Sequence, residues 1–324
     1  MSEFQLIRQF FAPLGAARTD VVLGVGDDAA LVDHGGTELL ALCVDTLTAG
    51  VHFPTDAPAD AVGYKALAVN LSDLAAMGAQ PAWALLALSL PAVDADWLAG
   101  FKSGFQRLAE AHGVALIGGD TTRGALAASV TLLGAVERGA ALRRDGARPG
   151  DRIYVSGTLG DAAAGLRLWQ SGQRSATGGA AELIARLHYP TPRLALGRAL
   201  RGLASAAIDI SDGLAADLGH ILERSGVGAT VEIERLPLSQ ALVSACGRSE
   251  ASALALAGGD DYELCFTVSP AQEAALTEAV SALGSAVTAI GTIDAAPGLR
   301  LIDAAGRQVR PPAQGGYQHF GEAP

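Results

Sequence analysis

Residues 39–45 read Leu-Leu-Ala-Leu-Cys-Val-Asp, an apolar run that ends in an acid, and this pattern is the main guide to the fold. Runs of the same kind, followed by glycine or an acid, occupy 21–26, 114–119, 206–208 and 254–259. Short apolar runs with such boundaries are typical of buried strands. We therefore predict that acids gather where strands end. Their oxygens can then converge on a hard cation such as Mg²⁺, which proteins usually bind together with substrate phosphates.

The order of the patterns predicts an α/β (or α+β) fold, because strand-like runs and helical patterns alternate in both halves of the chain. Helical patterns in the first half cover 58–77 and 94–112. Residues 139–150 contain Arg143, Arg144 and Pro149 and lack hydrophobic periodicity. We therefore predict a linker at 139–150, between an N-terminal domain of residues 1–138 and a C-terminal domain of residues 151–324.

Composition limits the partners and the location. The 324 residues are 50% hydrophobic and 18% charged, with a formal net charge of −11. Because the sequence has no basic patch, we expect no nucleic-acid partner. The cysteines at 43, 246 and 265 are scattered and odd in number, which is typical of reduced thiols. The start lacks a signal-peptide pattern, and no apolar run approaches the roughly 20 residues of a membrane helix. We therefore expect a cytoplasmic protein that does not associate with membranes.

The acids that end the runs are candidate metal ligands, but each also has a structural interpretation. Asp27 and Asp28 are adjacent in a glycine turn, where two like charges repel each other unless a cation neutralises them. A simple Gly-Asp turn explains the same residues. Asp45 can cap a helix instead of binding a metal. Gly118-Gly119-Asp120-Thr121 can point backbone amides at a phosphate or can simply form a tight turn.

Two further acidic motifs favour ligands over caps. Asn70 and Asp73 lie three residues apart in an apolar helical stretch, so they share a face, and a buried acid there needs a partner or a metal. In Asp209-Ile210-Ser211-Asp212, an N-cap accounts for one polar residue and leaves the others unexplained. Asp209 and Ser211 alternate along a strand end and therefore also share a face.

The remaining polar residues fit phosphoryl transfer. The sequence contains no Ser-His-acid spacing, Cys-x-x-Cys or His-Glu-x-x-His motif, so we expect neither a covalent nucleophile nor a general base. The guanidinium groups of Arg143 and Arg144 suit phosphates, although surface arginines in a linker are the commoner case. His52 alone is more typical of a structural histidine. In phosphoryl transfer, catalysis consists of positioning and of charge neutralisation by metal ions.

Taken together and in this order, the motifs resemble bacterial thiamine-monophosphate kinases, a family within the aminoimidazole-ribonucleotide synthetase superfamily. The resemblance spans about residues 3–320. The motifs are Gly26-Asp27-Asp28, Val44-Asp45-Thr46-Leu47, Gly50-Val51-His52-Phe53, the stretch 65–78, Gly118-Gly119-Asp120-Thr121, Asp209-Ile210-Ser211-Asp212-Gly213-Leu214, Gly258-Gly259-Asp260-Asp261-Tyr262-Glu263-Leu264 and Gly316-Tyr317-Gln318-His319-Phe320.

The resemblance implies a two-domain synthetase-like fold whose N-terminal domain contributes to the β-barrel of a homodimer. It implies ATP-dependent phosphorylation of thiamine monophosphate to thiamine diphosphate, by direct in-line transfer with several Mg²⁺ ions. The metal positions that it implies are Asp28, Cys43, Val44, Asp45, Asp73, Asp120, Asp209 and Asp212. The nucleotide positions are Gly119, Asp120, Arg144 and Ser211, and the substrate positions are His52, Asp260 and Tyr317.

One departure from the family pattern and two other functions stay open. The family often has Ser or Thr at positions 43 and 44, so Val44 can contact a metal only through its backbone carbonyl. The chain can instead be another ATP-dependent synthetase of the same superfamily. It can also be a non-catalytic protein that binds thiamine phosphate or metal.

Overall fold

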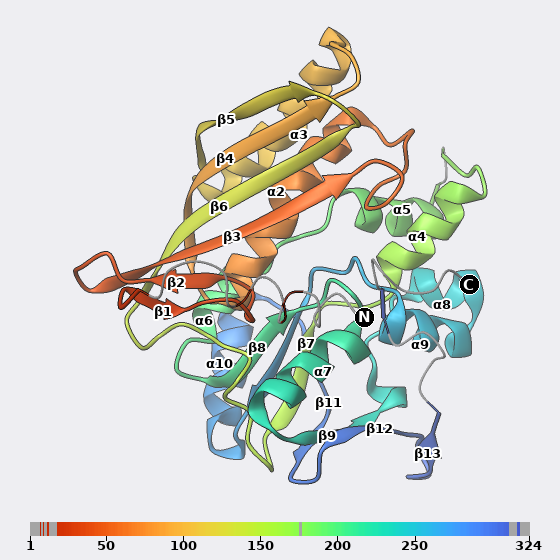
Figure 1. The fold of residues 1–324 in the computed structure, drawn as a ribbon. Coiled ribbons are helices and arrows are strands. Elements are labelled where there is room, and N and C mark those ends of the chain that lie inside the picture. The colour runs from red at the N-terminus through yellow and green to blue at the C-terminus, as the bar shows by residue number, and fades with distance from the viewer. Residues whose placement is uncertain are drawn as a thin grey trace.

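The chain builds two β-sheets, an upper one from its first half and a lower one from its second half (Figure 1). The computed structural model describes residues 18–174, 177–310 and 316–317, together with residues 7, 9 and 12. Within these residues, no helix has both the length and the apolar character needed to cross a bilayer.

The upper sheet has six strands in the order β1-β2-β3-β6-β4-β5, with β4 and β5 parallel and the other neighbours antiparallel. Helices α2 (Ala59–Ala76) and α3 (Ala95–His112) lie on one side of it (Figure 1). The strands are β1 (Val21–Leu23), β2 (Ala30–Val32), β3 (Glu38–Thr48), β4 (Gln80–Leu90), β5 (Ala115–Arg123) and β6 (Ala127–Glu137).

The lower sheet has seven strands in the order β13-β12-β9-β11-β7-β10-β8. Its strands are β7 (Arg152–Ser156), β8 (Ala204–Asp209), β9 (Gly228–Glu232), β10 (Leu264–Val268), β11 (Val287–Asp294), β12 (Gly298–Ile302) and β13 (Gln308–Val309). The helices of this half are α4 (Asp161–Gln170), α5 (Gly179–His188), α6 (Leu194–Ala199), α7 (Leu214–Ser225), α8 (Gln240–Cys246), α9 (Arg248–Ala257) and α10 (Glu273–Leu283), with 3₁₀ turns at Ile233–Arg235 and Pro270–Gln272. Helices α7 and α10 pack on opposite faces of the sheet. Cys265 and Phe266 are adjacent on β10, so their side chains point to opposite faces; Cys265 packs in the core that contains α7, and Phe266 in the core that contains α10.

Three of the predicted buried strands are wrong in whole or in part. At 21–26 only Val21–Leu23 form a strand, and Val21 and Val22 are exposed. The run at 254–259 is the end of α9, because leucine and alanine favour a helix and the run has no β-branched residue. The run at 114–119 does form β5, but every residue of that strand is exposed. The strand lies at the edge of the sheet, so the apolar composition of this run does not reflect burial in the single chain.

Helix α2 lies between the two halves and is buried on nearly all sides. It contacts β3 and β6 of the upper sheet, α3, and also α6 and β8 of the lower half. The helix packs very closely on α3. A Cβ added at Gly63 would lie 1.9 Å from the carbonyl oxygen of Phe101, and one added at Gly104 would lie 1.8 Å from that of Asp60. Both glycines therefore set the distance between the helices.

This close packing predicts that a single methyl group added at Gly104 lowers the stability of the protein. Gly104→Ala should lower the free energy of unfolding by about 2 kcal/mol or more, because backbone rather than a flexible side chain meets the new atom. Gly219→Ala is the matched control, since Gly219 lies in α7 with nothing within 4 Å of an added Cβ. That change should stabilise by up to about 1 kcal/mol. Urea unfolding of both variants measures the difference, and equal stabilities would contradict this account of the packing.

Candidate active site

A cleft of about 1350 Å³ runs between the two halves. One end is acidic, and the other is lined by Phe53, Leu166, Trp169 and Leu187 together with the ion pair of Asp56 and Arg174. A volume of this size is larger than that of a typical pocket for one small molecule. The cleft can therefore hold two ligands end to end.

Three carboxylates converge at the acidic end. One oxygen each of Asp28, Asp73 and Asp209 lies within 4.8 Å of the others. Asp28 comes from the turn between β1 and β2, Asp73 from α2 and Asp209 from the end of β8. Ser72 supports this arrangement, because its hydroxyl donates to Asp209 Oδ2 at 2.7 Å. The predicted convergence of acids from distant runs is thus present in the structure.

The electrostatics of this cluster are unfavourable without a counter-charge. Burial, and then repulsion from Asp45 and Asp209, raise the pKa of Asp73 well above its ordinary value. Burial, and then Asp28, raise the pKa of Asp209 in the same way. Buried carboxylates that repel one another in this way are suited to a hard divalent cation, which takes oxygen ligands.

Asp45 lies beside the cluster on β3. Burial, and then Asp212 and Asp28, raise its pKa to about 6. The amide of Asn70 orients the strand end, since its Oδ1 accepts from the backbone N–H of Asp45 at 3.1 Å. Cys43 faces the same helix, and its buried Sγ lies 3.5 Å from the carbonyl oxygen of Asn70. Burial raises the pKa of Cys43 well above its usual range, so its thiol stays protonated. The side chain of Val44 is exposed, although the residue also lines the cleft.

Arg144 is the cation of the acidic end. Its Nη2 contacts Asp28 Oδ1 at 2.6 Å, and its Nε donates to Asp28 Oδ2 at 3.3 Å. Its backbone N–H donates to Asp27 Oδ2 at 3.2 Å. Burial, followed by repulsion from Asp28, raises the pKa of Asp27 to about 6. Arg143, the alternative guanidinium, instead pairs with the neighbouring Asp145.

Two acidic turns from the second half close the cleft. Residues 209–213 and 258–263 are joined by backbone hydrogen bonds, including Asp260 N–H to Ser211 O at 2.7 Å and Tyr262 N–H to Ile210 O at 2.8 Å. Gly259 makes this contact possible, because a Cβ there would lie 2.6 Å from Ser211 O, and its φ is +67°.

The sequence analysis missed Asp217 in α7. Its buried Oδ2 accepts from the backbone N–H groups of 211, 212 and 213 at 3.1, 3.0 and 3.1 Å, so it holds the turn that carries Ser211 and Asp212. An acid in the apolar helical run Leu214-Ala-Ala-Asp217-Leu was the available signal.

The three predicted substrate residues line the same cleft. His52 accepts a hydrogen bond at Nδ1 from the Thr48 N–H at 2.9 Å, which stabilises the turn after β3. Asp260 forms an ion pair with Lys65, a residue of the 65–78 motif to which the sequence analysis gave no role. Tyr317 is tied to the first acidic turn through its N–H, which donates to Asp212 O at 3.0 Å.

Gly119 and Asp120 lie outside this cleft. Asp120 on β5 pairs with Ala87 on β4. Ala87 pairs with Ser129 on β6, and Ser129 pairs with Thr46 on β3. Paired residues share a face. Asp120 is therefore three strand spacings, about 14 Å, from β3 and on the sheet face opposite to Asp45. Gly119 has a positive φ, and a Cβ added there would lie 1.9 Å from the carbonyl oxygen of Leu86 on the neighbouring strand. The pairing of β5 with β4 therefore explains the glycine at this position. The roles of Gly119 and Asp120 in nucleotide and metal binding stay predictions.

Two domain families match this chain. Residues 26–136 match the AIR synthase related protein N-terminal domain, and residues 148–304 match the AIR synthase related protein C-terminal domain. A thiamine-monophosphate kinase from Salmonella typhimurium (strain LT2) is 50% identical over 295 residues, which are 90% of each chain. The thiamine-monophosphate kinase of Haemophilus influenzae is 44% identical over 329 residues, covering 100% of this chain and 99% of the relative.

Solved structures of thiamine-monophosphate kinases are similar to this chain as well. A thiamine-monophosphate kinase from Stenotrophomonas maltophilia K279a is 53% identical with a TM-score of 0.81, covering 90% of this chain and 93% of that one. AaThiL complexed with AMPPCP and TMP is 35% identical with a TM-score of 0.85, covering 98% and 97%. The predicted two-domain α/β fold of the AIR synthase type is confirmed. The linker at 139–150 stays a prediction.

The acidic cluster predicts a stability effect that depends on metal. Asp73→Asn should raise the melting temperature in EDTA at pH 8 by a few degrees, because it removes a buried charge that burial and two carboxylates oppose. The same variant should lose most of the stabilisation that Mg²⁺ gives the unmodified protein. Asp145→Asn is the control, since Asp145 is exposed and pairs only at the surface. A lower melting temperature for Asp73→Asn in EDTA, with its Mg²⁺ response intact, would show that Asp73 is a structural residue.

Proposed function

The chain belongs to the thiamine-monophosphate kinase family, and we propose that it transfers the γ-phosphoryl group of ATP to thiamine monophosphate, giving thiamine diphosphate. The observation that carries this proposal is the division of one cleft into an acidic end and an apolar end. AaThiL, which shares the fold and 35% of its residues, was solved with an ATP analogue and TMP together. A cleft that can hold two ligands end to end supports the same pair here.

The acidic end is the site for the phosphates. Asp28, Asp73 and Asp209, with Asp45 and Asp212 beside them, would hold Mg²⁺ ions. When bound, such ions neutralise phosphate oxygens as charge moves between donor and acceptor. Arg144 reaches the same end, and its planar guanidinium suits a phosphate. Ser211 lies in the turn at this end and can contact the nucleotide.

The other end is the site for the thiamine part of the acceptor. Trp169, Phe53 and Leu187 provide apolar surface, and Tyr317 an aromatic face suited to a cationic ring. Asp260 provides a carboxylate, and the same lysine, Lys65, contacts both Asp260 and the carbonyl oxygen of His52. In this orientation the acceptor phosphate points toward Asp73.

The reaction needs positioning rather than proton transfer. The second pKa of a phosphate monoester is about 6, so the attacking oxygen is ionised near neutral pH without a general base. The main barrier is then repulsion between two anions. The chain contributes by aligning the acceptor oxygen with the γ-phosphorus.

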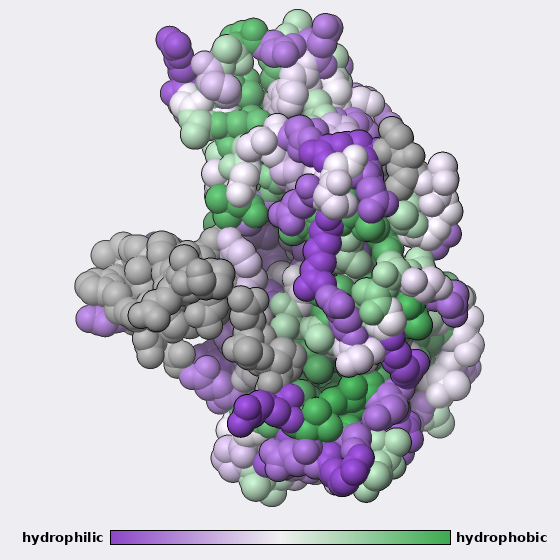
Figure 2. All heavy atoms as spheres, turned by 90° about the vertical axis from the view of Figure 1, so that its right-hand side faces the viewer, coloured by the Kyte–Doolittle hydropathy of each residue, from purple (hydrophilic) through white to green (hydrophobic). Residues whose placement is uncertain are grey.

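We propose that the protein is a homodimer that forms through the open face of the upper sheet. On this face the side chains of Val44, Trp83 and Leu85 are 61%, 45% and 38% exposed, and Ile117 on the edge strand is 58% exposed. Exposed apolar surface of this kind on a sheet favours a partner. By contrast, the face turned toward the viewer in Figure 2 mixes hydrophilic and hydrophobic residues. Asp120 lies on the open face, so a second copy can bring its own Asp120 toward this cleft. A cytoplasmic location stays a prediction.

The reaction itself is tested with a panel of acceptors. With ATP and Mg²⁺, the purified protein should form thiamine diphosphate and ADP from thiamine monophosphate, and chromatography separates the products. Turnover with a different phosphorylated acceptor and none with thiamine monophosphate would indicate another member of the superfamily. Binding of thiamine monophosphate without ADP formation would indicate a non-catalytic protein.

The position of Asp120 predicts complementation between two inactive variants. Asp45→Asn and Asp120→Asn should each lose activity by orders of magnitude. If Asp120 serves the cleft of the other subunit, a mixed dimer of the two variants has one intact site. Random exchange of subunits should then restore about a quarter of the unmodified activity, since half of the dimers are mixed and each has one intact site of two. Activity that stays absent after verified exchange would place Asp120 in its own subunit's site, and a monomeric mass would rule out the dimer.

A further inference from the structure

The turn that carries Asp260 is held in an unfavourable backbone conformation. Asp260 has φ +67° and Tyr262 has φ +52°, and these are the non-glycine residues with positive φ in the described part of the chain. Such a conformation persists only where the surroundings impose it, and it is common at binding sites. We therefore asked which contacts hold this turn.

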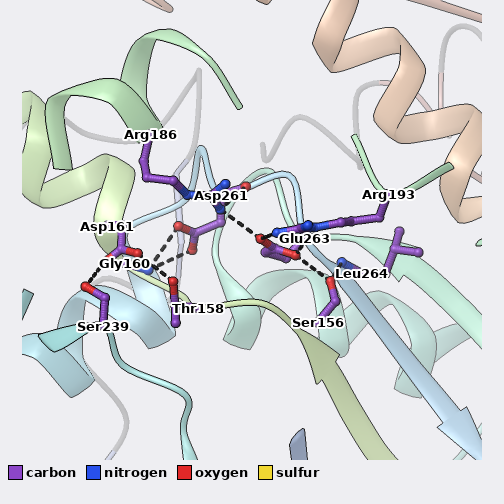
Figure 3. A network of polar contacts seen from close by, with 10 residues as sticks. All are labelled: Ser156, Thr158, Gly160, Asp161, Arg186, Arg193, Ser239, Asp261, Glu263 and Leu264. Carbon is purple, nitrogen blue, oxygen red and sulfur yellow. Dashed lines mark hydrogen bonds and ion pairs between the residues drawn. The ribbon is translucent and has the colours of Figure 1, made fainter. Parts of the chain in front are cut away.

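One anchor is a network of polar contacts around Asp261 and Glu263 (Figure 3). Side chains alternate along residues 260–263, so that Asp260 and Tyr262 line the cleft while Asp261 and Glu263 are buried in a polar network. The Asp261 carboxylate accepts from the N–H of Gly160 at 2.9 and 3.0 Å. Glu263 is contacted by Arg193 Nε at 2.6 Å and by Arg186 Nη2 at 2.8 Å, and it accepts from the Ser156 hydroxyl. This network fixes the backbone of the turn.

The second anchor is Lys65, which contacts the Asp260 side chain itself. Lys65 lies in α2, and its side chain is 3% exposed, compared with 27% for Asp260. Its ammonium group forms an ion pair with Asp260 Oδ2 and donates to the carbonyl oxygen of His52 at 3.2 Å. One buried cation therefore joins two of the three predicted substrate residues, which are more than two hundred positions apart in sequence.

Lys65 lies on the same helix as Asp73 of the acidic cluster. Lys65 and Asp73 are eight residues apart, so they lie on similar faces of the helix and about 12 Å apart along its axis. Val69, midway between them, lines the cleft. The same helix thus supports the acidic cluster through Asp73, and Asp260 and His52 through Lys65.

We propose that Lys65 is a positioning residue that fixes the Asp260 carboxylate and the His52 loop for the ring end of the acceptor. This inference rests on the proposed function. Lys65 acts through Asp260 rather than by touching the nucleotide, because it lies about 12 Å along α2 from Asp73 of the acidic cluster. Its removal frees the Asp260 side chain to turn, and a small misplacement of a binding group can cost a large factor in rate.

The test compares the effect of Lys65 on the KM for the acceptor with its effect on the KM for the nucleotide. Lys65→Met should raise the KM for thiamine monophosphate ten- to a hundredfold and leave the KM for ATP within about twofold. Lys65→Arg keeps the charge and should recover part of the loss. Lys102→Met, at an exposed position on α3, is the matched control and should leave both constants unchanged. If Lys65→Met fails to fold, the comparison of Lys65→Arg with the unmodified protein gives the same split in smaller measure.

A double-mutant cycle tests whether Lys65 acts through Asp260. In an Asp260→Asn background, Lys65→Met should change the KM for thiamine monophosphate by less than about threefold, since the group that it positions is already lost. Equal effects of Lys65→Met in both backgrounds, equal rises in both KM values, or an unchanged KM for the acceptor would overturn the proposal. Failure of the unmodified protein to use thiamine monophosphate would instead contradict the proposed function, so the two failures are distinguishable.

Discussion

The burial of like charge beside α2 is the constraint on which the rest of the structure depends. A helix packed between two sheets would ordinarily be apolar throughout, yet α2 carries Lys65 and Asn70 buried in the molecule and Asp73 half-buried at the cleft. Asp73 meets two further carboxylates there, from the β1–β2 turn and from β8. Holding these groups together costs free energy that close packing elsewhere must offset, and Gly63 and Gly104 allow that packing between α2 and α3. Stability is given up locally where binding needs it.

Much of this arrangement could be predicted from the sequence, because acids at the ends of apolar runs are a local pattern with a topological consequence. The strand predicted at 39–45 and the helices predicted at 58–77 and 94–112 are present as β3, α2 and α3. Asp28, Asp73 and Asp209 meet as expected. The failures have a common cause. Hydrophobic composition does not tell a strand from a helix at 254–259, nor burial in one chain from exposure at an edge in β5.

Most of the contacts that the sequence analysis missed are long-range and depend on three-dimensional packing. Lys65 reaches Asp260 across the boundary between the halves, and Glu263 meets Arg186 and Arg193 from separate segments. Asp217 is nearer in sequence to the amides that it accepts from, but its role depends on the turn at 211–213. None of these pairs leaves a spacing signature. The acids of the cluster were therefore easier to find than the residues that hold the surrounding turns in place.

The ion pair between Arg144 and Asp28 has a thermodynamic consequence for the order of events in the cleft. A cation that binds Asp28 competes with the guanidinium for the same two oxygens, and it thereby frees Arg144 to meet a phosphate. Occupation of the cluster by a cation and binding of an anionic nucleotide then favour each other, and linkage requires the two effects to be equal in magnitude. Arg144 is thus an internal counter-ion of Asp28, and an exchange of its partner from carboxylate to phosphate would couple the two binding equilibria.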